Sequence, residues 1–202
     1  EIALTAGVHA THADAVIAVS ERDRKDLETW WKVRHPPVRT VLNGIRPPAS
    51  LPPPSRPAVP YFLFVGALEA RKNLPNLLAG FARFKASTGR PHRLVLVGAE
   101  PRGLGVVPER MAALKASCPA RDALDFRGPM ALDDPRLPTL LRNAAALCGV
   151  SWYETFGFPW VEAMAYDCPV IATTAGAGPE VVGDAGLLCD PADPEAIAAA
   201  MT

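Results

Sequence analysis

The sequence predicts an α/β domain with a Rossmann-like parallel sheet and helices on both faces. The first observation is that apolar runs recur along the chain, at residues 61–66, 92–98, 144–150 and 169–173. The second is that segments of helical periodicity separate these runs, and strands that alternate with helices form parallel sheets covered on both sides. The third is length, because 202 residues hold one such domain with a sizeable core and some extra chain.

Composition excludes several classes of function. Lys plus Arg and Asp plus Glu number 21 each, so no net field attracts nucleic acid or an anionic membrane. The four cysteines lack C-x-x-C spacing and lie mostly in or beside apolar runs, which indicates core thiols in a reducing compartment. No apolar run approaches the roughly 18 residues of a membrane helix, and the start lacks a signal-peptide pattern. We therefore expect a cytoplasmic protein, or one peripheral to the membrane. No metal pair is expected at His9 and His12, which lack a third ligand nearby.

The chain begins with a strand and a helix. Residues 13–19 form an apolar run, and Ser20 is a typical N-cap for a charged helix that reaches about residue 31. Residues 47–60 contain seven prolines, which predicts an extended connector that cannot enter a sheet interior. A proline-rich recognition peptide is the alternative, supported by composition alone.

A strand, a loop and a helix follow at residues 61–88. Asn73 can cap the helix, in which apolar residues recur on one face at Leu74, Leu77, Leu78, Phe81 and Phe84. The loop GALEARKN places Arg71 and Lys72 after a strand and beside a helix N-terminus. Two cations at such a position indicate a bound anion. The alternative is that they are solvated loop charges.

The later elements continue the alternation. Strands are expected at residues 92–98, 124–128 and 169–173, and helices near residues 107–114, 138–146 and 193–202. The Gly- and Pro-rich loop at residues 98–105 lacks the G-x-G-x-x-G pattern of a dinucleotide site.

The most informative stretch is SWYETFGFPWVEAM, residues 151–164. Pro159 suits the first turn of a helix that reaches about Tyr166, so Glu154 lies in the loop before it and Glu162 about one turn inside. Both carboxylates can face one ligand. Gly157 allows close backbone approach or a positive φ, and the helix N-terminus offers N–H groups to a phosphate. These features predict a nucleotide-sugar site. The alternative is a solvated helix residue and a turn residue.

This stretch resembles the E-x7-E motif of the retaining GT-B glycosyltransferases, in particular glycosyltransferase family 4. The match runs from Glu154 through Gly157, Pro159 and Glu162 to Pro169 and beyond. Three positions depart from the family pattern, and none removes a charged ligand group: Val150, Thr155 and Asp167.

The resemblance implies roles for these residues. Lys72 matches a Lys that holds the donor diphosphate, and Arg71 is either its partner or merely adjacent, because Ala67 stands where the family often has Arg. Glu154 would contact the donor sugar and Glu162 the ribose hydroxyls. Met130 would meet the base through its backbone, although core packing is an equally good interpretation. The remaining donor-binding residues would be Gly66, Thr155, Phe156, Gly157 and Phe158.

The resemblance also implies an organisation. It places a further strand at residues 38–42. Residues 1–46, which end near Asn43-Gly44-Ile45, would be the tail of an N-terminal Rossmann-like domain. Residues 47–60 would be the linker, and residues 61–202 a nucleotide-sugar-binding domain that lacks its C-terminal end. Any membrane contact would then involve the domain outside this chain.

The implied function is a retaining glycosyltransferase that uses a nucleoside-diphosphate sugar, with GDP-mannose favoured by the GALEARKN form. The acceptor would be a glycan or a lipid-linked glycan, and no cofactor or metal is expected. The isolated chain would be inactive because its acceptor half is missing. A non-catalytic nucleotide-binding module is the alternative. A nucleotide-sugar epimerase would need a dinucleotide fingerprint and a Tyr-x-x-x-Lys pair, which the sequence lacks.

Overall fold

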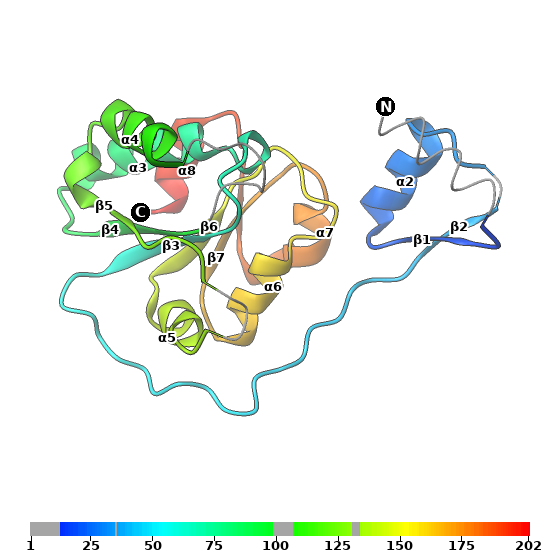
Figure 1. Cartoon of the computed structure of the whole chain (residues 1–202), viewed down its shortest axis with the longest axis horizontal. Coiled ribbons are helices and arrows are strands. Elements are labelled where there is room, and N and C mark those ends of the chain that lie inside the picture. Colours follow the sequence, from blue (N-terminus) through cyan, green and yellow to red (C-terminus); the bar gives the residue numbers. More distant parts are fainter. Residues whose placement is uncertain (1–12, 35, 99–106, 131–133) are drawn as a thin grey trace.

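A six-stranded sheet forms the centre of the protein in the computed structural model, which describes residues 13–34, 36–98, 107–130 and 134–202 (Figure 1). The strands run in the order β5-β4-β3-β6-β7-β8, and every neighbouring pair is parallel. Their bounds are β3 (Tyr61–Val65), β4 (Arg93–Val97), β5 (Leu124–Phe126), β6 (Ala146–Gly149), β7 (Val170–Thr173) and β8 (Leu187–Cys189). The predicted fold class is confirmed.

Helices connect these strands. Their bounds are α3 (Leu74–Thr88), α4 (Val107–Ser117), α5 (Arg136–Asn143), α6 (Phe158–Ala165), α7 (Gly178–Val182) and α8 (Pro194–Ala200). The whole apolar stripe expected on α3 is buried. The helix expected at residues 138–146 ends at Asn143 instead, because Ala144 takes extended backbone and Ala146 begins β6. Most of the loop expected at residues 98–105 lies outside the described residues.

The sheet carries apolar side chains on both faces, because successive residues of a strand point to opposite sides. Phe62 and Phe64 pack in one cluster with residues of α3 and α8, whereas Leu63 packs in another with residues of α5 and α6. Figure 1 shows α3 and α8 on one side of the sheet and α5 and α6 on the other. Burial on both faces holds the strands in place and leaves their carboxyl ends to carry the loops.

The place of β3 in the sheet determines where a ligand can bind. From β3 the chain moves outward to β4 and β5, and then returns to the other side of β3 with β6. In such a sheet, the crevice for a ligand opens at the carboxyl ends of the two strands where the order reverses. Residues 66–73 and 150–157 are the loops that follow β3 and β6, and they hold most of the predicted site residues.

The N-terminal segment is a separate strand-helix-strand unit. β1 (Val16–Ala18) and β2 (Val38–Thr40) pair in parallel, and α2 (Glu21–Thr29) connects them. Ser20 caps α2 as predicted, since its Oγ accepts a hydrogen bond of 3.0 Å from the Asp23 backbone N–H. Residues 41–60 contain neither helix nor strand and lead to β3 (Figure 1). That they link two domains stays a prediction.

Two further observations concern the chain as a whole. All four cysteines are buried and unpaired, which confirms that they are core thiols. Among the described residues, no helix has the length and apolar character needed to cross a bilayer. His9 and His12 lie outside these residues.

Candidate functional site

Glu154 lies at the centre of an ionic cluster. Its Oε1 is 2.7 Å from Lys72 Nζ, and its Oε2 is 2.8 Å from Arg71 Nη1. Ser151 Oγ donates a third hydrogen bond of 2.8 Å to Oε1. The structure therefore brings together the two cations of the loop after β3 and the carboxylate of the loop after β6. They meet at the crevice where the strand order reverses.

The cluster is sheltered unevenly from water. The side chains of Lys72 and Glu154 are each 11% exposed, whereas that of Arg71 is 42% exposed. Glu69 Oε1 also lies 3.5 Å from Arg71 Nη2, so the two cations are balanced by two carboxylates in the absence of ligand. Arg71 is the most exposed cation, and it would have to leave its carboxylate partners to contact an anion.

Asn73 organises the loop that carries the two cations. Asn73 is the N-cap residue of α3, as predicted, but its side chain makes no capping hydrogen bond, since its backbone takes the left-handed conformation, with φ 56°, rather than the extended one that suits a side-chain cap. Its amide Nδ2 instead donates to the carbonyls of Val150, at 3.0 Å, and Pro191, at 2.6 Å. The side chain is buried and ties the loop of Lys72 to two other loops.

Backbone contacts hold Glu154 from the opposite side. Its carbonyl accepts a hydrogen bond of 2.9 Å from the Ala177 N–H. A Cβ at Gly176, which has φ 60°, would lie 2.5 Å from that same carbonyl oxygen, so only glycine fits there. The Trp152 N–H donates to the Arg71 carbonyl at 2.9 Å and joins the two site loops. Sequence reasoning missed Ser151, Asn73 and Gly176 as supports; a Ser directly after a buried strand was the available signal.

The loop before α6 has free hydrogen-bond donors. Among the described residues, no acceptor pairs with the backbone N–H groups of Thr155, Phe156 and Gly157. Gly157 has φ 93°, and a Cβ there would lie 2.1 Å from the Trp160 ring. The predicted positive φ is thus confirmed, and packing against Trp160 also requires the glycine. Phe156 is buried, and its ring meets the exposed ring of Phe158 edge-on at 5.3 Å.

Gly66, at the end of β3, lies against the stem of Lys72. Its φ of 155° favours glycine, and a Cβ there would lie 3.5 Å from Lys72 Cε. Met130, after β5, is half-buried and packs against the core cluster of α5 and α6. The packing interpretation of Met130 is therefore supported, and its contact with a base stays a prediction.

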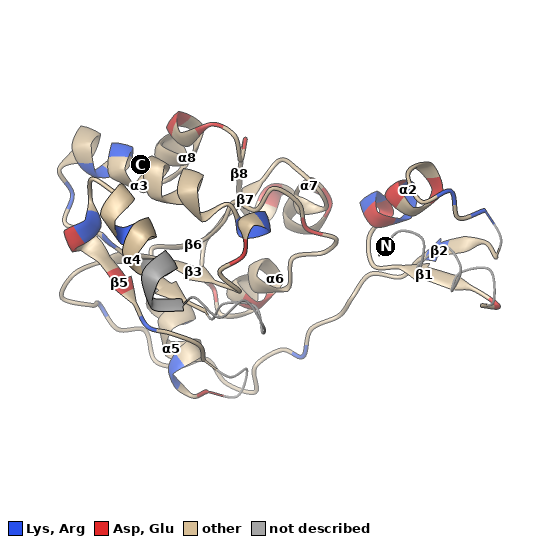
Figure 2. Cartoon of the chain, turned by 45° about the horizontal axis from the view of Figure 1, so that its top comes forward, with Lys and Arg blue, Asp and Glu red and all other residues tan. Residues whose placement is uncertain are grey.

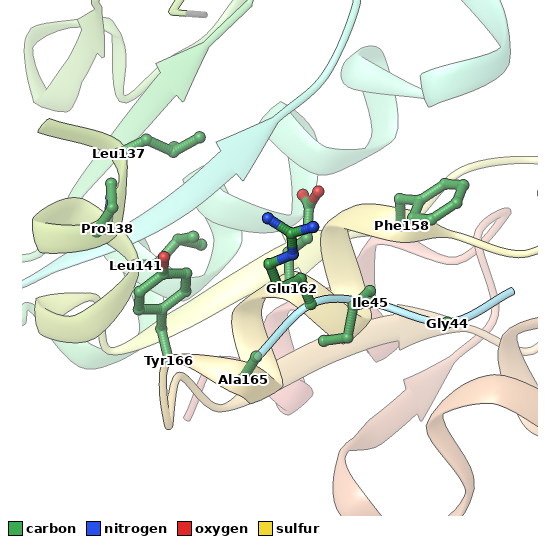
Figure 3. A pocket seen from close by; sticks show the side chains of 10 residues that line it. Gly44, Ile45, Leu137, Pro138, Leu141, Phe158, Glu162, Ala165 and Tyr166 are labelled. Atoms are coloured by element: carbon green, nitrogen blue, oxygen red, sulfur yellow. The ribbon is translucent and has the colours of Figure 1, made fainter. Parts of the chain in front are cut away.

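Glu162 lies in different surroundings from Glu154. It is half-buried and faces a cavity of about 330 Å³, shown in Figure 3. The lining residues are Gly44, Ile45, Arg46, Leu137, Pro138, Leu141, Phe158, Glu162, Ala165 and Tyr166. Glu162 accepts no hydrogen bond from any described residue, and burial raises the pKa of its carboxyl above the ordinary value of 4.5. The cavity does not include Glu154 or Lys72, so the structure does not bring the two carboxylates into one cavity.

A parallel sheet of this order, with helices on both sides and a basic pair at the crevice, defines the class as a GT-B glycosyltransferase domain. The family model described as "Glycosyl transferases group 1" matches residues 59–202. The chain belongs to this family.

Individual relatives agree with this assignment. The chain is 34% identical over 139 residues to the O-antigen chain mannosyltransferase B of Escherichia coli, a match that covers 69% of this chain and 35% of the relative. It is 45% identical over 73 residues to the MMP alpha-(1->4)-mannosyltransferase of Mycolicibacterium hassiacum, covering 35% of this chain and 18% of the relative. The chain thus spans less than half the length of these relatives.

Solved structures show the same fold. Sucrose-phosphate synthase from Thermosynechococcus elongatus superposes with a TM-score of 0.82 at 26% identity, covering 98% of this chain and 51% of that one. Anabaena HepE in complex with UDP-glucose also gives 0.82, at 20% identity, covering 98% of this chain and 56% of that one.

Proposed function

We propose that the protein transfers a sugar, with retention of anomeric configuration, from a nucleoside-diphosphate sugar to an acceptor glycan or lipid-linked glycan. This chain supplies the half that binds the donor. The observation that carries the proposal is the cluster of Lys72, Arg71 and Glu154 at the crevice of the sheet. Family membership and the relatives named as glycosyltransferases support the reaction class.

Lys72 and Arg71 act on the diphosphate. When the glycosidic bond breaks, negative charge develops on the β-phosphate oxygen of the leaving group. A cation held in advance at that position stabilises the transition state by about 3–4 kcal/mol in comparable sites. Lys72 is sheltered and fixed by Glu154, so it needs little reorganisation, whereas Arg71 turns from Glu154 to the phosphate. In other phosphate sites a metal ion neutralises the negative charge of the diphosphate. Here Lys72 and Arg71 would do so, and we therefore expect that transfer requires no metal ion.

Glu154 acts on the donor sugar. In the free protein its carboxylate is occupied by both cations and by Ser151. When Arg71 turns to the diphosphate, the Oε2 atom that it had occupied becomes available to a hydroxyl of the sugar ring, while Oε1 keeps Lys72 in place. The unpaired N–H groups of Thr155, Phe156 and Gly157 lie in the same loop and add donors for a phosphate oxygen.

Glu162 acts on the nucleoside. A cavity of about 330 Å³ accommodates a small ligand, and this one combines the Glu162 carboxylate and the Arg46 guanidinium with walls that include Leu137 and Phe158. The ribose hydroxyls would donate to Glu162, which has no other described partner. The base would lie against the apolar walls.

GDP-mannose is the proposed donor. Two relatives at 34% and 45% identity are named as mannosyltransferases, and the loop sequence GALEARKN points the same way. The test is transfer by the full-length protein from GDP-mannose, UDP-glucose and ADP-glucose to a mannose-terminated oligosaccharide, with EDTA present and absent. We expect product from GDP-mannose alone, with the α configuration of the donor retained. The rate of transfer should be the same with and without EDTA. Tight binding of GDP without transfer from any donor would instead favour a nucleotide-binding module without catalysis.

A further inference from the structure

Helix α2 of the N-terminal unit contacts the six-stranded domain beside the ionic cluster. The carboxylate of Glu180, on α7, accepts hydrogen bonds from the backbone N–H groups of Glu21, at 2.8 Å, and Arg22, at 3.1 Å. The hydroxyl of Tyr153, in the loop after β6, donates to Asp26 Oδ2 at 2.6 Å. We propose that this α2 contact, made by Tyr153 and Glu180, fixes the N-terminal unit over the site and positions Glu154 for transfer. The second half of this proposal rests on the proposed function.

Glu180 complements the start of α2. The first N–H groups of a helix have no partner within the helix, and they carry a partial positive charge. Ser20 pairs with one of them, that of Asp23. Glu180 accepts from two more of these N–H groups, those of Glu21 and Arg22, with one carboxylate oxygen for each. The partners are 159 and 158 positions apart in the sequence. Both acidic and basic positions are coloured along the ribbon of α2 in Figure 2, and the acidic Glu21 is itself paired with Arg24. Glu21 and Asp23 also lie in the first turn of α2, but the N–H groups of Glu21 and Arg22 pair with the carboxylate of the other unit.

Tyr153 makes the second half of the contact. Arg22 lies over the Tyr153 ring, with 5.8 Å between its guanidinium carbon and the ring centre, and also pairs with Asp26 at 2.9 Å. The three side chains thus form one group across the two units. Burial, together with the bond to Asp26, raises the pKa of the Tyr153 hydroxyl well above its ordinary value of 10.0. The hydroxyl stays protonated and remains a donor at neutral pH.

Both residues of the contact belong to segments that hold Glu154. Tyr153 directly precedes Glu154, and its carbonyl accepts a hydrogen bond of 3.2 Å from Arg71 Nη1. Glu180 lies on α7, which begins at Gly178, directly after the Ala177 N–H that donates to the Glu154 carbonyl. A shift of α2 is therefore transmitted to both sides of Glu154. Tyr153 and Glu180 are positioning residues, since neither lies within the proposed sites for donor sugar or nucleoside.

The connection between the two units gives the contact its importance. Residues 41–60 join β2 to β3 without a helix or strand. A chain of this length and proline content limits the separation of the units without fixing their orientation. Orientation then depends on contacts such as those of Tyr153 and Glu180, together with those that residues 44–46 of the connector make at the Glu162 cavity.

The test measures orientation directly. Spin labels are placed in the full-length protein at Lys25→Cys on α2 and Ala86→Cys on the outer side of α3, where both native side chains are exposed. The four cysteines of these 202 residues are buried, and any exposed cysteine elsewhere in the full-length protein is replaced by Ser before labelling. The variants are Glu180→Gln, which keeps size and removes charge, Tyr153→Phe, which removes only the hydroxyl, and the double variant. Glu195→Gln is the matched control, because Glu195 is an exposed carboxylate that pairs with Arg83 inside the six-stranded domain.

Each single variant is expected to lower the ratio of docked to undocked molecules about threefold, and the double variant about tenfold, as exposed helix-terminus and hydrogen-bond contacts predict. The kcat for transfer falls with the fraction of docked molecules, while the affinity for GDP and the melting temperature of the six-stranded domain stay unchanged. The control moves none of these.

An unchanged distance distribution in the double variant overturns the contact, whatever happens to activity. A broadened distribution with full kcat keeps the contact and overturns its role in positioning Glu154. If the wild-type protein transfers no sugar, the distance measurement still decides whether the contact exists, so failure of the proposed function remains distinguishable.

Discussion

The two glutamates of one motif lie in opposite environments. Glu154 is buried, and its carboxylate accepts hydrogen bonds from the cations Lys72 and Arg71 and from the Ser151 hydroxyl. Glu162 is half-buried, faces a cavity and has no described hydrogen-bond partner, and burial raises the pKa of its carboxyl. The difference teaches that contacts within the protein fix the position of the Glu154 carboxylate, whereas the Glu162 carboxylate gains hydrogen-bond partners only when a ligand binds. Their substitutions should therefore affect different measurements.

The largest expected effect is that of Lys72→Ala, which removes the sheltered cation of the Glu154 environment. We expect kcat/KM for transfer to fall about 100- to 1000-fold, because one preorganised donor at a developing charge contributes about 3–4 kcal/mol. Folding should persist, since a loop cation contributes little packing. Steady-state kinetics and a melting curve check this.

Arg83→Ala is the matched control, because Arg83 is an exposed cation of α3 whose salt bridge lies away from the cluster. Full activity in Lys72→Ala together with inactivity in Arg71→Ala would reverse the assignment within the pair.

The second effect is that of Glu154→Gln. The substitution keeps the size of the side chain and removes the charge that holds both cations. Transfer should fall about 10- to 100-fold, as the loss of a charge-assisted hydrogen bond to the sugar predicts. Affinity for bare GDP should be equal or higher, because Lys72 and Arg71 no longer have a competing carboxylate. Calorimetry measures the affinity for GDP, and transfer kinetics measure the loss of activity. Weaker GDP binding would show that Glu154 contacts the nucleotide itself.

The third effect, that of Glu162→Gln, is expected in the affinity for GDP. Two ribose hydroxyls that lose an ionised acceptor should weaken GDP binding about tenfold, by the magnitude of a charge-assisted hydrogen bond. The matched control is Glu195→Gln, an exposed glutamate on α8. Equal losses of GDP affinity in Glu154→Gln and Glu162→Gln would remove the distinction between the two environments.

The sequence predicted the fold because the information is local. Strands that are apolar at every position, such as residues 61–65, and a helix with a continuous apolar stripe, such as α3, reveal their burial in a few consecutive residues. β8 escaped prediction because it is short: its three residues, Leu187–Cys189, form an apolar run too brief to stand out between Gly186 and Asp190.

The sequence also predicted the charged members of the site, through the loops after β3 and β6. Apart from Ser151, which is three residues from Glu154, their supports could not be predicted, because those contacts join distant positions. Asn73 bonds carbonyls 77 and 118 positions away, and Glu180 bonds α2 across 159. Asn73 carried a plausible local role as a helix cap, and the left-handed backbone that cancels that role is a consequence of tertiary packing.

The smallest expected effect is a pH dependence that belongs to Glu162 alone. Burial raises the pKa of the free carboxyl above 4.5, and ribose hydroxyls that donate to the ionised form lower its pKa in the complex. GDP binding therefore releases a proton, and affinity rises with pH between the bound and the free pKa, then levels off above the free value. Because the phosphates of GDP also titrate, the measured quantity is the ratio of affinities of wild type and Glu162→Gln. That ratio should increase from about pH 4 toward neutrality.

Stability in the absence of ligand should move in the other direction. A carboxyl whose folded pKa is raised loses stability as pH rises from its unfolded value through its folded value, because the folded state binds the proton more tightly. Glu162→Gln mimics the protonated form, so it should raise the melting temperature of the free protein at neutral pH and leave it unchanged near pH 3. A lower melting temperature at neutral pH would mean that the Glu162 carboxylate has a partner within the protein, and the contrast with Glu154 would be lost.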